Sequence, residues 1–191
     1  MRFETFAPLA QLDFITHAFT LRTDDDTKAE AFESRLLRQL GFAGGASAEQ
    51  THGNAVAVVT APERVPGVDA LVTRQRRLPL VIRCADCPPV FLVDRRTPAI
   101  ALIHSGRKGT LANVAGETLR AMPAGADFAF IGPSIGPCHY EMDLWTAIEH
   151  QLVGLEVHNP RVCTACHLDR YFSYRAEKGN TGRMFAVLSL R

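Results

Sequence analysis

Three short segments of the sequence carry side chains that could bind a metal ion or act as nucleophiles. Their reactive residues are His52, Cys87 and His104, and each stands beside an apolar run of strand length. Side chains at strand ends gather in the loops where functional sites form. Two imidazoles and one thiolate suit zinc, and three protein ligands leave a fourth position for water or substrate. A histidine at a strand end is also common as a structural residue, so the spacing alone leaves both interpretations open.

The segment that begins at His104 has a second feature. Gly106 and Gly109 flank Arg107 and Lys108, and a helix is predicted to follow. Backbone N–H groups at a helix start, together with two cations, favour a phosphate or another anion. The spacing of glycine and lysine differs from that of a P-loop. A tight turn with two solvated cations is the alternative interpretation.

The remaining cysteines do not form a recognisable zinc or disulfide pattern. The chain has five cysteines, an odd number, which favours thiols used as ligands, nucleophiles or packing groups. The pair Cys84 and Cys87 is separated by 75 residues from the pair Cys163 and Cys166, far more than the ~15–20 of a zinc ribbon. We therefore predict that Cys84, Cys163 and Cys166 pack in the interior, with His167 a candidate for a minor metal site.

Two further regions are predicted to form a pocket wall. Residues 133–141 surround Cys138, His139 and Glu141 with glycine and proline, which indicates a shaped loop. Residues 172–175 and 181–183 add aromatic rings and two cations near the end of the chain, although each segment taken alone could be plain surface.

The composition excludes several classes of protein. The 191 residues suit one domain, residues 1–191, with a substantial core. With 21 basic and 20 acidic residues there is no basic excess, so we expect no nucleic-acid partner. No apolar run approaches the ~20 residues of a membrane span, and the first ten residues lack the pattern of a signal peptide. We expect a cytoplasmic monomer with no membrane partner.

The hydrophobic pattern predicts an α/β fold. A helix is predicted at 27–40, with Thr27 and Glu30 forming a capping box, and others at 111–122 and from Asp143 to about Gly154. Strands do not alternate strictly with the helices, which favours mixed sheets over a doubly wound parallel one. The predicted strands are 56–59, 70–72, 80–82, 90–93, 100–103, 128–131 and 185–190.

Taken in order along the chain, these motifs resemble the laccase-domain (YfiH-like) family, whose members are also labelled polyphenol oxidase or purine nucleoside phosphorylase. The motifs that carry the resemblance are His17-Ala-Phe-Thr-Leu-Arg22, Gln50-Thr-His-Gly53, Asp69-Ala-Leu-Val-Thr73, Cys84-Ala-Asp-Cys-Pro-Pro-Val90, Gly132-Pro-Ser-Ile-Gly-Pro-Cys138, Tyr140-Glu141, Cys163-Thr164, Phe172-Ser-Tyr-Arg175 and Thr181-Gly-Arg183.

The resemblance implies a zinc ion bound by His52, Cys87 and His104. It also implies a layered sandwich of mixed β-sheets flanked by helices, similar to some toxin deamidases that use a Cys/His pair. The implied activities are phosphorolysis of adenosine, inosine, guanosine and methylthioadenosine, and deamination of adenosine, so the expected partners are a purine nucleoside and phosphate.

Two departures from the family pattern bear on the substrate. The usual His-Ala-Gly-Trp-Arg-Gly is replaced here by Ser105, Arg107 and Lys108 within the His104 segment, so a tryptophan is lost while Lys108 keeps the charge of the arginine. The Gly-Gly-x-Ser loop that follows the early arginine is missing, since Arg22 runs directly into Thr23-Asp-Asp-Asp26.

The predicted roles follow from this chemistry. A carboxyl group must transfer protons, and Asp86 and Glu141 are the catalytic candidates, with Lys108 a third; Asp86 could instead orient a metal ligand. Phosphate would be held by cations. The candidates are Arg22, Arg107, Lys108 and Arg175.

Three alternatives remain. Cys87 activated by His104 could form a metal-free cysteine hydrolase or deamidase. Copper in a polyphenol oxidase is the second, although multicopper sites use many histidines and the seven here are isolated in sequence. The third is a non-enzymatic interaction module that carries zinc.

Overall fold

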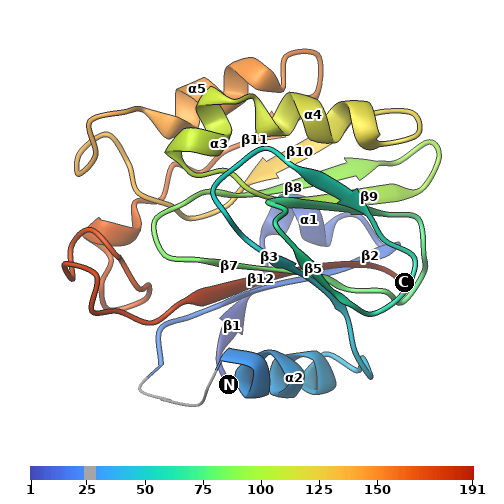
Figure 1. The fold of residues 1–191 in the computed structure, drawn as a ribbon, viewed down its shortest axis with the longest axis horizontal. Helices are drawn as coiled ribbons and strands as arrows, with labels where there is room; N and C mark the ends of the chain where they lie inside the picture. Colours follow the sequence, from blue (N-terminus) through green and yellow to red (C-terminus); the bar gives the residue numbers. More distant parts are fainter. Residues whose placement is uncertain (24–28) are drawn as a thin grey trace.

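The computed structural model describes residues 1–23 and 29–191. Two six-stranded sheets pack face to face, and helices cover the outer side of each (Figure 1). The helices Arg107–Leu111, Val114–Ala121 and Leu144–Gln151 lie on one side, and the helix Ala29–Gln39 lies on the other. The predicted layered sandwich of mixed sheets is therefore confirmed. Thr27, the predicted cap of the first long helix, and residues 24–26 of the predicted loop departure lie outside the described residues.

Each sheet combines parallel and antiparallel pairs. The first sheet has the order β1 (Phe3–Glu4), β2 (Ile15–Thr20), β12 (Met184–Leu190), β7 (Leu80–Cys84), β3 (Ala46–Glu49), β5 (Arg64–Pro66). The second has the order β11 (Glu156–His158), β10 (Phe128–Ile131), β8 (Pro89–Asp94), β9 (Ala99–His104), β6 (Ala70–Thr73), β4 (Val56–Val58). The helices are α1 (Ala7–Ala10), α2 (Ala29–Gln39), α3 (Arg107–Leu111), α4 (Val114–Ala121), α5 (Leu144–Gln151) and the 3-10 helix η1 (Thr164–Cys166).

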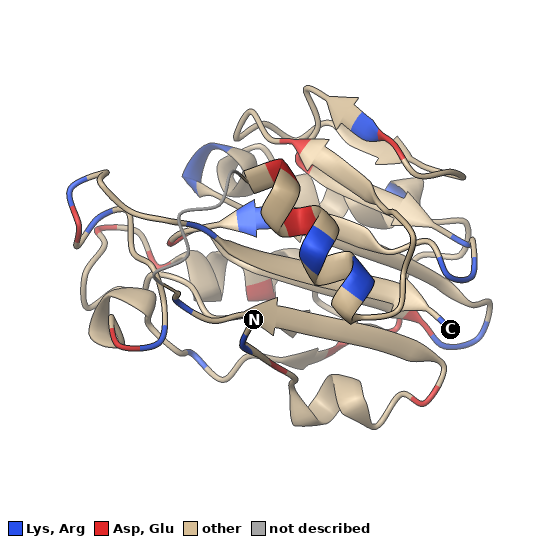
Figure 2. Cartoon of the chain, turned by 90° about the horizontal axis from the view of Figure 1, so that it is seen from below, with Lys and Arg blue, Asp and Glu red and all other residues tan. Residues whose placement is uncertain are grey.

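Most of the central strands are apolar along their whole length because both faces of each sheet are covered. One core lies between the sheets and includes Phe19, Leu80 and Phe91. A second fills the space between the second sheet and helices α4 and α5, and a third lies under α2. A strand that is buried on both faces has a continuous apolar sequence. Charged residues lie mainly on loops and along α2 (Figure 2). No described helix is long and apolar enough to cross a membrane.

The sequence pattern located most of the strands but misplaced one helix boundary. The helix predicted at 111–122 is present as α4 but begins later, at Val114; Leu111, predicted as its first residue, ends α3 and is 68% exposed. Asn113 adopts a left-handed conformation with φ 59°, and its side chain accepts a hydrogen bond from the Gly116 N–H. Asn113 is therefore the N-cap of α4 and separates it from α3, although the apolar spacing predicted one continuous helix. Asp143 caps α5 as predicted, accepting from the Thr146 N–H.

One buried histidine of β2 makes stability depend on pH. The ring Nε2 of His17 accepts a hydrogen bond from the Phe6 N–H at 2.8 Å, so the ring must be neutral in the folded chain. Burial lowers the pKa of His17 to about 4, and the positive charge of Arg191 adds to the effect. The unfolded chain takes up this proton near pH 6.5, so it binds more protons than the folded chain between pH 6.5 and 4.

We therefore expect the free energy of unfolding to fall as the pH is lowered from 6.5 to 4, by up to about 3 kcal/mol from this residue. Urea unfolding at a series of pH values measures the change, and His17→Gln should flatten it in this range. His150→Asn, at an exposed histidine of α5, is the matched control and should leave the pH dependence unchanged. An equally steep pH dependence in His17→Gln would contradict the assignment.

Candidate metal centre and pocket

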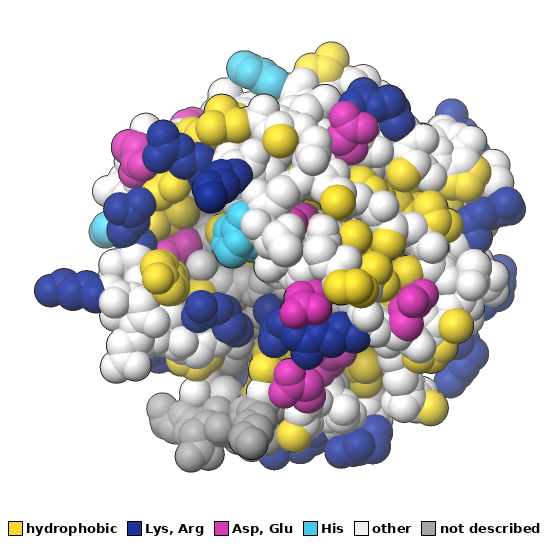
Figure 3. Space-filling model, viewed as in Figure 1, with side chains coloured by type: hydrophobic (Ala, Val, Ile, Leu, Met, Phe, Trp, Pro, Cys, Tyr) yellow, Lys and Arg dark blue, Asp and Glu magenta, His cyan; other side chains and the backbone are white. Residues whose placement is uncertain are grey.

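A pocket of about 1020 Å³ opens at the edge where the chain repeatedly crosses from one sheet to the other. The segment after β3 leads to β4, the segment after β7 leads to β8, and β9 ends beside the start of β8, where His104 pairs with Pro89. In Figure 3 a hollow on this face is bordered by histidine and by Lys and Arg side chains. Residues from both sheets thus line one cavity.

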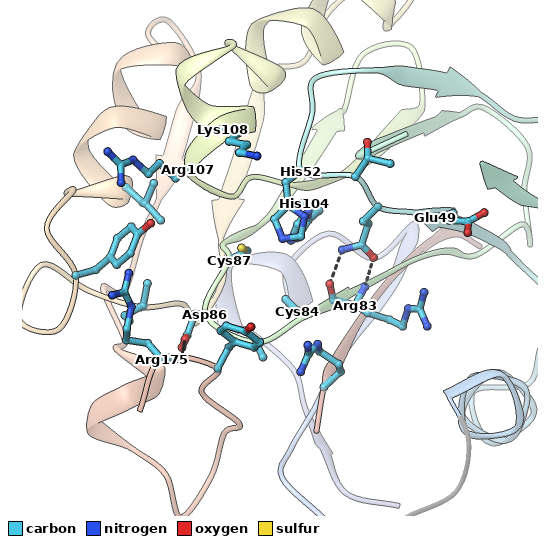
Figure 4. Close-up of a pocket in the computed structure, with 18 of the residues that line it drawn as sticks. Glu49, His52, Arg83, Cys84, Asp86, Cys87, His104, Arg107, Lys108 and Arg175 are labelled. Carbon is cyan, nitrogen blue, oxygen red and sulfur yellow. Dashed lines mark hydrogen bonds between the residues drawn. The ribbon is translucent and has the colours of Figure 1, made fainter. Parts of the chain in front are cut away.

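His52, Cys87 and His104 meet at the base of this pocket. One ligand atom of each lies within 4.8 Å of the other two, and the two imidazole rings are 4.8 Å apart at an angle of 81°. The three side chains point toward one another in Figure 4. His104 is buried, Cys87 is half-buried and His52 is exposed, so the group is open on the pocket side. This arrangement offers three protein ligands and leaves space for another.

Asp69, whose role the local sequence does not reveal, positions two of the three ligands, His52 and His104. His104 donates its Nδ1–H to the Asp69 carboxylate at 2.8 Å, which leaves Nε2 as the ring nitrogen available to a metal. The same carboxylate accepts the backbone N–H groups of Thr51, His52 and Gly53 and the Thr51 hydroxyl. Asp69 therefore fixes both the tautomer of His104 and the loop that carries His52.

The electrostatics of the group favour a thiolate. Burial alone would raise the pKa of Cys87, but hydrogen bonds from His104 and His52 lower it to about 6. Burial lowers the pKa of His104, but the hydrogen bonds to Asp69 and to Cys87 raise it to about 9. Burial would raise the pKa of Asp69, but the His104 and Gly53 hydrogen bonds hold it below its ordinary value. A thiolate is the form in which cysteine binds a metal or attacks a substrate.

The backbone around the site is held in unusual conformations. His52 has φ 63° and Asp86 has φ 82°, a region that residues other than glycine seldom occupy. Such strain persists only where the surroundings fix the backbone, and it is concentrated at functional sites. Gly106 is required for a different reason: a Cβ there would lie 2.9 Å from the Cys87 Sγ.

A family model described as multi-copper polyphenol oxidoreductase laccase matches residues 7–143 and 139–191. The chain belongs to this family. Purine nucleoside phosphorylase YlmD of Geobacillus stearothermophilus is 29% identical over 98% of this chain and 86% of its own length. Purine nucleoside phosphorylase SCO2081 of Streptomyces coelicolor is 37% identical over 71% of this chain and 70% of its own length.

Solved structures of the family share the fold. The crystal structure of YlmD from G. stearothermophilus superposes with a TM-score of 0.84 at 25% identity, covering 93% of this chain and 92% of that one. YfiH of Bacillus licheniformis superposes with a TM-score of 0.88 at 21% identity, covering 99% of both chains. The sequence alignment with YlmD runs over 241 positions for a chain of 191 residues, so YlmD has segments that this member of the laccase family lacks.

In this laccase-family chain the pocket is strongly basic. Seven of the residues that line it are Lys or Arg, whereas Glu49 and Asp86 are the acidic ones among the described residues. Lys108 and Arg107 stand on one side of the three metal-type ligands, and Arg175 lies near Asp86 (Figure 4). Helix α3 has only five residues, so its cations rather than its dipole supply most of the positive potential. Such a pocket attracts anions.

Arg107, Arg175 and Glu141 form one ionic group at the rim. The Glu141 carboxylate accepts from Arg107 Nη1 at 2.8 Å and lies 3.5 Å from Arg175 Nη2. Arg175 also stacks over the ring of Tyr140 at 4.7 Å. Glu141 thus holds two of the predicted phosphate ligands in place and does not itself line the pocket.

Asp86 lies in the pocket wall, where it fixes two other segments. Its Oδ1 accepts from the Thr164 hydroxyl and its Oδ2 accepts from the Arg175 N–H, both at 2.7 Å. Its own carbonyl accepts the Ile135 N–H at 2.8 Å. Three segments distant in sequence are therefore joined at this one residue.

Arg22 does not line the pocket. It donates to Glu177 Oε1 at 2.5 Å and to the Tyr171 carbonyl at 3.2 Å, and it stacks over Phe172 at 4.7 Å. Glu177 also accepts from the Ser173 N–H and the Thr181 hydroxyl. The Arg22–Glu177 ion pair therefore holds in place, from outside the pocket, the segment that carries Tyr174 and Arg175.

We expect Glu177→Gln to lower the free energy of unfolding at pH 7 by about 1–2 kcal/mol, because a hydrogen-bonded ion pair is lost. The Arg22 hydrogen bond lowers the pKa of Glu177 to about 2, so the contribution is present above pH 4.5 and is lost as the pH falls toward 2. Urea unfolding measures it. Glu117→Gln, in the exposed pair with Arg120 on α4, is the control and should cost less than about 0.5 kcal/mol. Equal effects of the two variants would contradict this assignment.

The structure corrects one prediction about the other cysteines. Cys84 is buried in the core as predicted, and burial raises the pKa of its thiol. Cys163 is buried, but Cys166 is exposed, so its predicted packing role is wrong. Both lie beside Cys138 and His139 in a second group of potential metal ligands, to which His167 does not belong in the described structure.

Proposed function

We propose that this chain is a zinc-dependent purine nucleoside phosphorylase that also deaminates adenosine. The observation that carries the proposal is the convergence of His52, Cys87 and His104 at one point of a pocket rich in cations. The names of YlmD and SCO2081, both purine nucleoside phosphorylases, support the substrate class. The expected substrates are adenosine, inosine, guanosine and methylthioadenosine.

The residues present fit zinc. Two imidazoles and one thiolate are zinc ligands, the Asp69 carboxylate fixes the tautomer of His104, and the pocket side of the group is open. Zinc held there would supply a Lewis acid and lower the pKa of water toward about 7. Copper in a blue-copper site also uses His₂Cys but adds a weak axial ligand, commonly methionine, and no methionine lines the pocket among the described residues.

In phosphorolysis a phosphate oxygen forms a bond to C1′ of the ribose while the C1′–N9 bond breaks and the purine leaves with a proton. Arg107, Lys108 and Arg175 would bind the phosphate, because their charges face the pocket and Glu141 orients two of them. We assign Arg22 to support of the wall instead. Tyr140 and Tyr174 offer aromatic faces for the purine in place of the tryptophan that the family usually has.

The proton for the leaving purine would be held by Asp86. This carboxylate lines the pocket, and its two hydrogen bonds leave other lone pairs free. Glu141 is less suited because it is engaged by two arginines at the rim. Asp86→Asn removes the charge and keeps one acceptor oxygen, for Thr164 or for the Arg175 N–H, so kcat should fall by about 10²-fold or more with the metal content unchanged.

In deamination, water replaces the amino group of adenosine to give inosine and ammonia. The same carboxylate would accept the proton of the attacking water and return one to the departing nitrogen. Phosphate is not consumed in this reaction, so it should proceed in phosphate-free buffer.

The test combines metal content with turnover. Protein purified without added metal is analysed by plasma mass spectrometry, beside Cys87→Ala and His104→Ala, and each is assayed on the four nucleosides with and without phosphate. We expect each variant to contain less zinc than the wild type by about one ion per chain, and to lose activity. Phosphate-dependent release of free base supports the proposal, and full activity in Cys87→Ala would overturn it.

One observation favours a second candidate, a metal-free cysteine hydrolase. The Cys87 thiol with its lowered pKa lies beside His104, an arrangement that activates a nucleophile. Prolonged chelation separates the two: the hydrolase would keep its activity and become sensitive to alkylation at Cys87, whereas the zinc enzyme would lose activity until zinc is restored. Stoichiometric copper with a visible thiolate band would instead favour the oxidase, and absence of any turnover with bound zinc would favour an interaction module.

A further inference from the structure

A second group of metal-type ligands lies outside the pocket. Cys138 and His139 belong to the loop that follows β10, and Cys163 and Cys166 flank and end the short helix η1. One ligand atom of each lies within 4.8 Å of the other three. None of the four lines the pocket or contributes to the proposed reaction.

Four distances within this group are close to the edges of a tetrahedron around zinc, and the remaining two are within 4.8 Å. Zn–S bonds of about 2.3 Å and Zn–N bonds of about 2.0–2.1 Å give edges of about 3.8 Å between sulfurs and about 3.6 Å between sulfur and nitrogen. The Cys138 and Cys166 sulfurs are 3.6 Å apart. His139 Nδ1 lies 3.3, 3.5 and 3.8 Å from the sulfurs of Cys138, Cys166 and Cys163. A disulfide would require a bonded distance of about 2.05 Å.

The backbone holds the two ligand-bearing segments together independently of the side chains. The Ser134 N–H donates to the Val162 carbonyl, and the Thr164 N–H donates to the Ser134 carbonyl. The Gly136 N–H donates to the Cys163 sulfur at 3.2 Å, the kind of hydrogen bond that stabilises a metal-bound thiolate. The ligands are therefore brought together by paired backbone rather than by chance proximity of flexible side chains.

We propose that Cys138, His139, Cys163 and Cys166 form a second zinc site, with a structural role. Three thiolates and one imidazole fill all four positions of a tetrahedral ion, so no position is left for a substrate. Soft thiolate ligands also select zinc over the oxygen-preferring cations. The site is closed, whereas the pocket site is open.

The position of the second site indicates what it stabilises. The loop after β10 carries Ile135 and Tyr140 into the pocket wall, and the segment of η1 carries Thr164, whose hydroxyl donates to Asp86. A zinc ion bound by both segments would tie them together behind the wall. Its removal should loosen the wall without removing any residue that touches the substrate.

Metal counting in paired variants tests the proposal. Under reducing conditions and without added metal, the wild type should contain about two zinc ions per chain, and Cys87→Ala and Cys166→Ser about one each. The double variant should contain none. His167→Ala, next to the cluster, is the matched control and should keep both ions. Zinc absent from Cys87→Ala, or as much zinc in Cys166→Ser as in the wild type, would overturn the second site whatever becomes of the first.

A spectroscopic measurement covers the case in which Cys166→Ser fails to fold. Cobalt loaded into Cys87→Ala leaves the cluster intact and should give the thiolate charge-transfer and tetrahedral absorption bands of a Cys₃His site. Cys138→Ser in the same background should weaken the charge-transfer band by about one third, since one of three thiolates is lost. A metal-free protein whose mass and peptide map show a Cys138–Cys166 disulfide would overturn the proposal.

Discussion

Replacing Asp69 by alanine is expected to lower zinc affinity at the pocket site by about 10–100-fold and to cost about 3–5 kcal/mol of stability. The carboxylate is fully buried and accepts five hydrogen bonds, from His104 and from residues 51–53. Its removal frees the His104 ring to rotate and leaves three backbone N–H groups without an acceptor. Zinc competition with a chelating dye and urea unfolding measure the two effects.

Asp94→Ala is the matched control for this experiment. Asp94 is also fully buried and accepts the N–H groups of Arg96 and Thr97, but it lies at the opposite end of β8 from the pocket. The control should therefore lose stability while keeping its zinc affinity. If Asp69→Ala bound zinc as tightly as Asp94→Ala, Asp69 would have no part in positioning the ligands.

Gly106→Ala is expected to lower zinc affinity by about 10–100-fold while the fold is kept, because overpacking of this size costs about 1–3 kcal/mol. The new Cβ would lie 2.9 Å from the Cys87 sulfur and 3.2 Å from His52 Cδ2. The backbone of Gly106, at φ −71°, is one that alanine adopts freely, so the effect comes from the crowded ligands. Equilibrium zinc competition measures it, with Cys87→Ala defining the signal from any other site.

Gly44→Ala is the control for the glycine experiment. A Cβ at Gly44 would meet Pro62 at 3.5 Å, an ordinary contact, so neither zinc affinity nor stability should change by more than about 0.5 kcal/mol. Unchanged zinc affinity in Gly106→Ala would contradict the described positions of Cys87 and His52, or would mean that the loop moves away from the new Cβ at no cost in free energy.

The three metal-type ligands could be found from sequence because each is a reactive residue at the end of an apolar run. Asp69 could not be assigned its role in the same way, although it begins a recognisable motif. Its role depends on the register between β6 and β9, which places Ala70 opposite Ile103 and so brings Asp69 beside His104. That register follows from the packing of whole strands, and the local sequence around Asp69 does not contain it.

Contacts between segments distant in sequence also explain why the sequence misassigned Arg22 and missed the second cysteine cluster. The sequence predicts Arg22 as a phosphate ligand because arginine suits phosphate, but its partner Glu177 is 155 residues away along the chain. A helix and a strand separate the Cys138 and Cys163 segments in sequence, and long-range contacts such as the bridge between Ser134 and Cys163 bring them together. In contrast, β6 to β10 and β12 were predictable, because a continuous apolar run is typical of a strand buried on both faces. The buried strand β2 was not predicted, because Thr16, His17 and Thr20 interrupt its apolar run.

The place of β12 in the first sheet bears on how the chain folds during synthesis. This strand, Met184–Leu190, lies between β2 and β7 and supplies the hydrogen bonds that join the N-terminal strands to the rest of the sheet. Until residues 184–190 have left the ribosome, the two-residue β1 is the one other strand of the described residues with which β2 can pair. Pairing of such distant segments is slow and leaves apolar edges exposed meanwhile. The first sheet therefore closes only after β12 has been synthesised, and until then β2 and β7 each expose the edge that β12 covers in the folded chain.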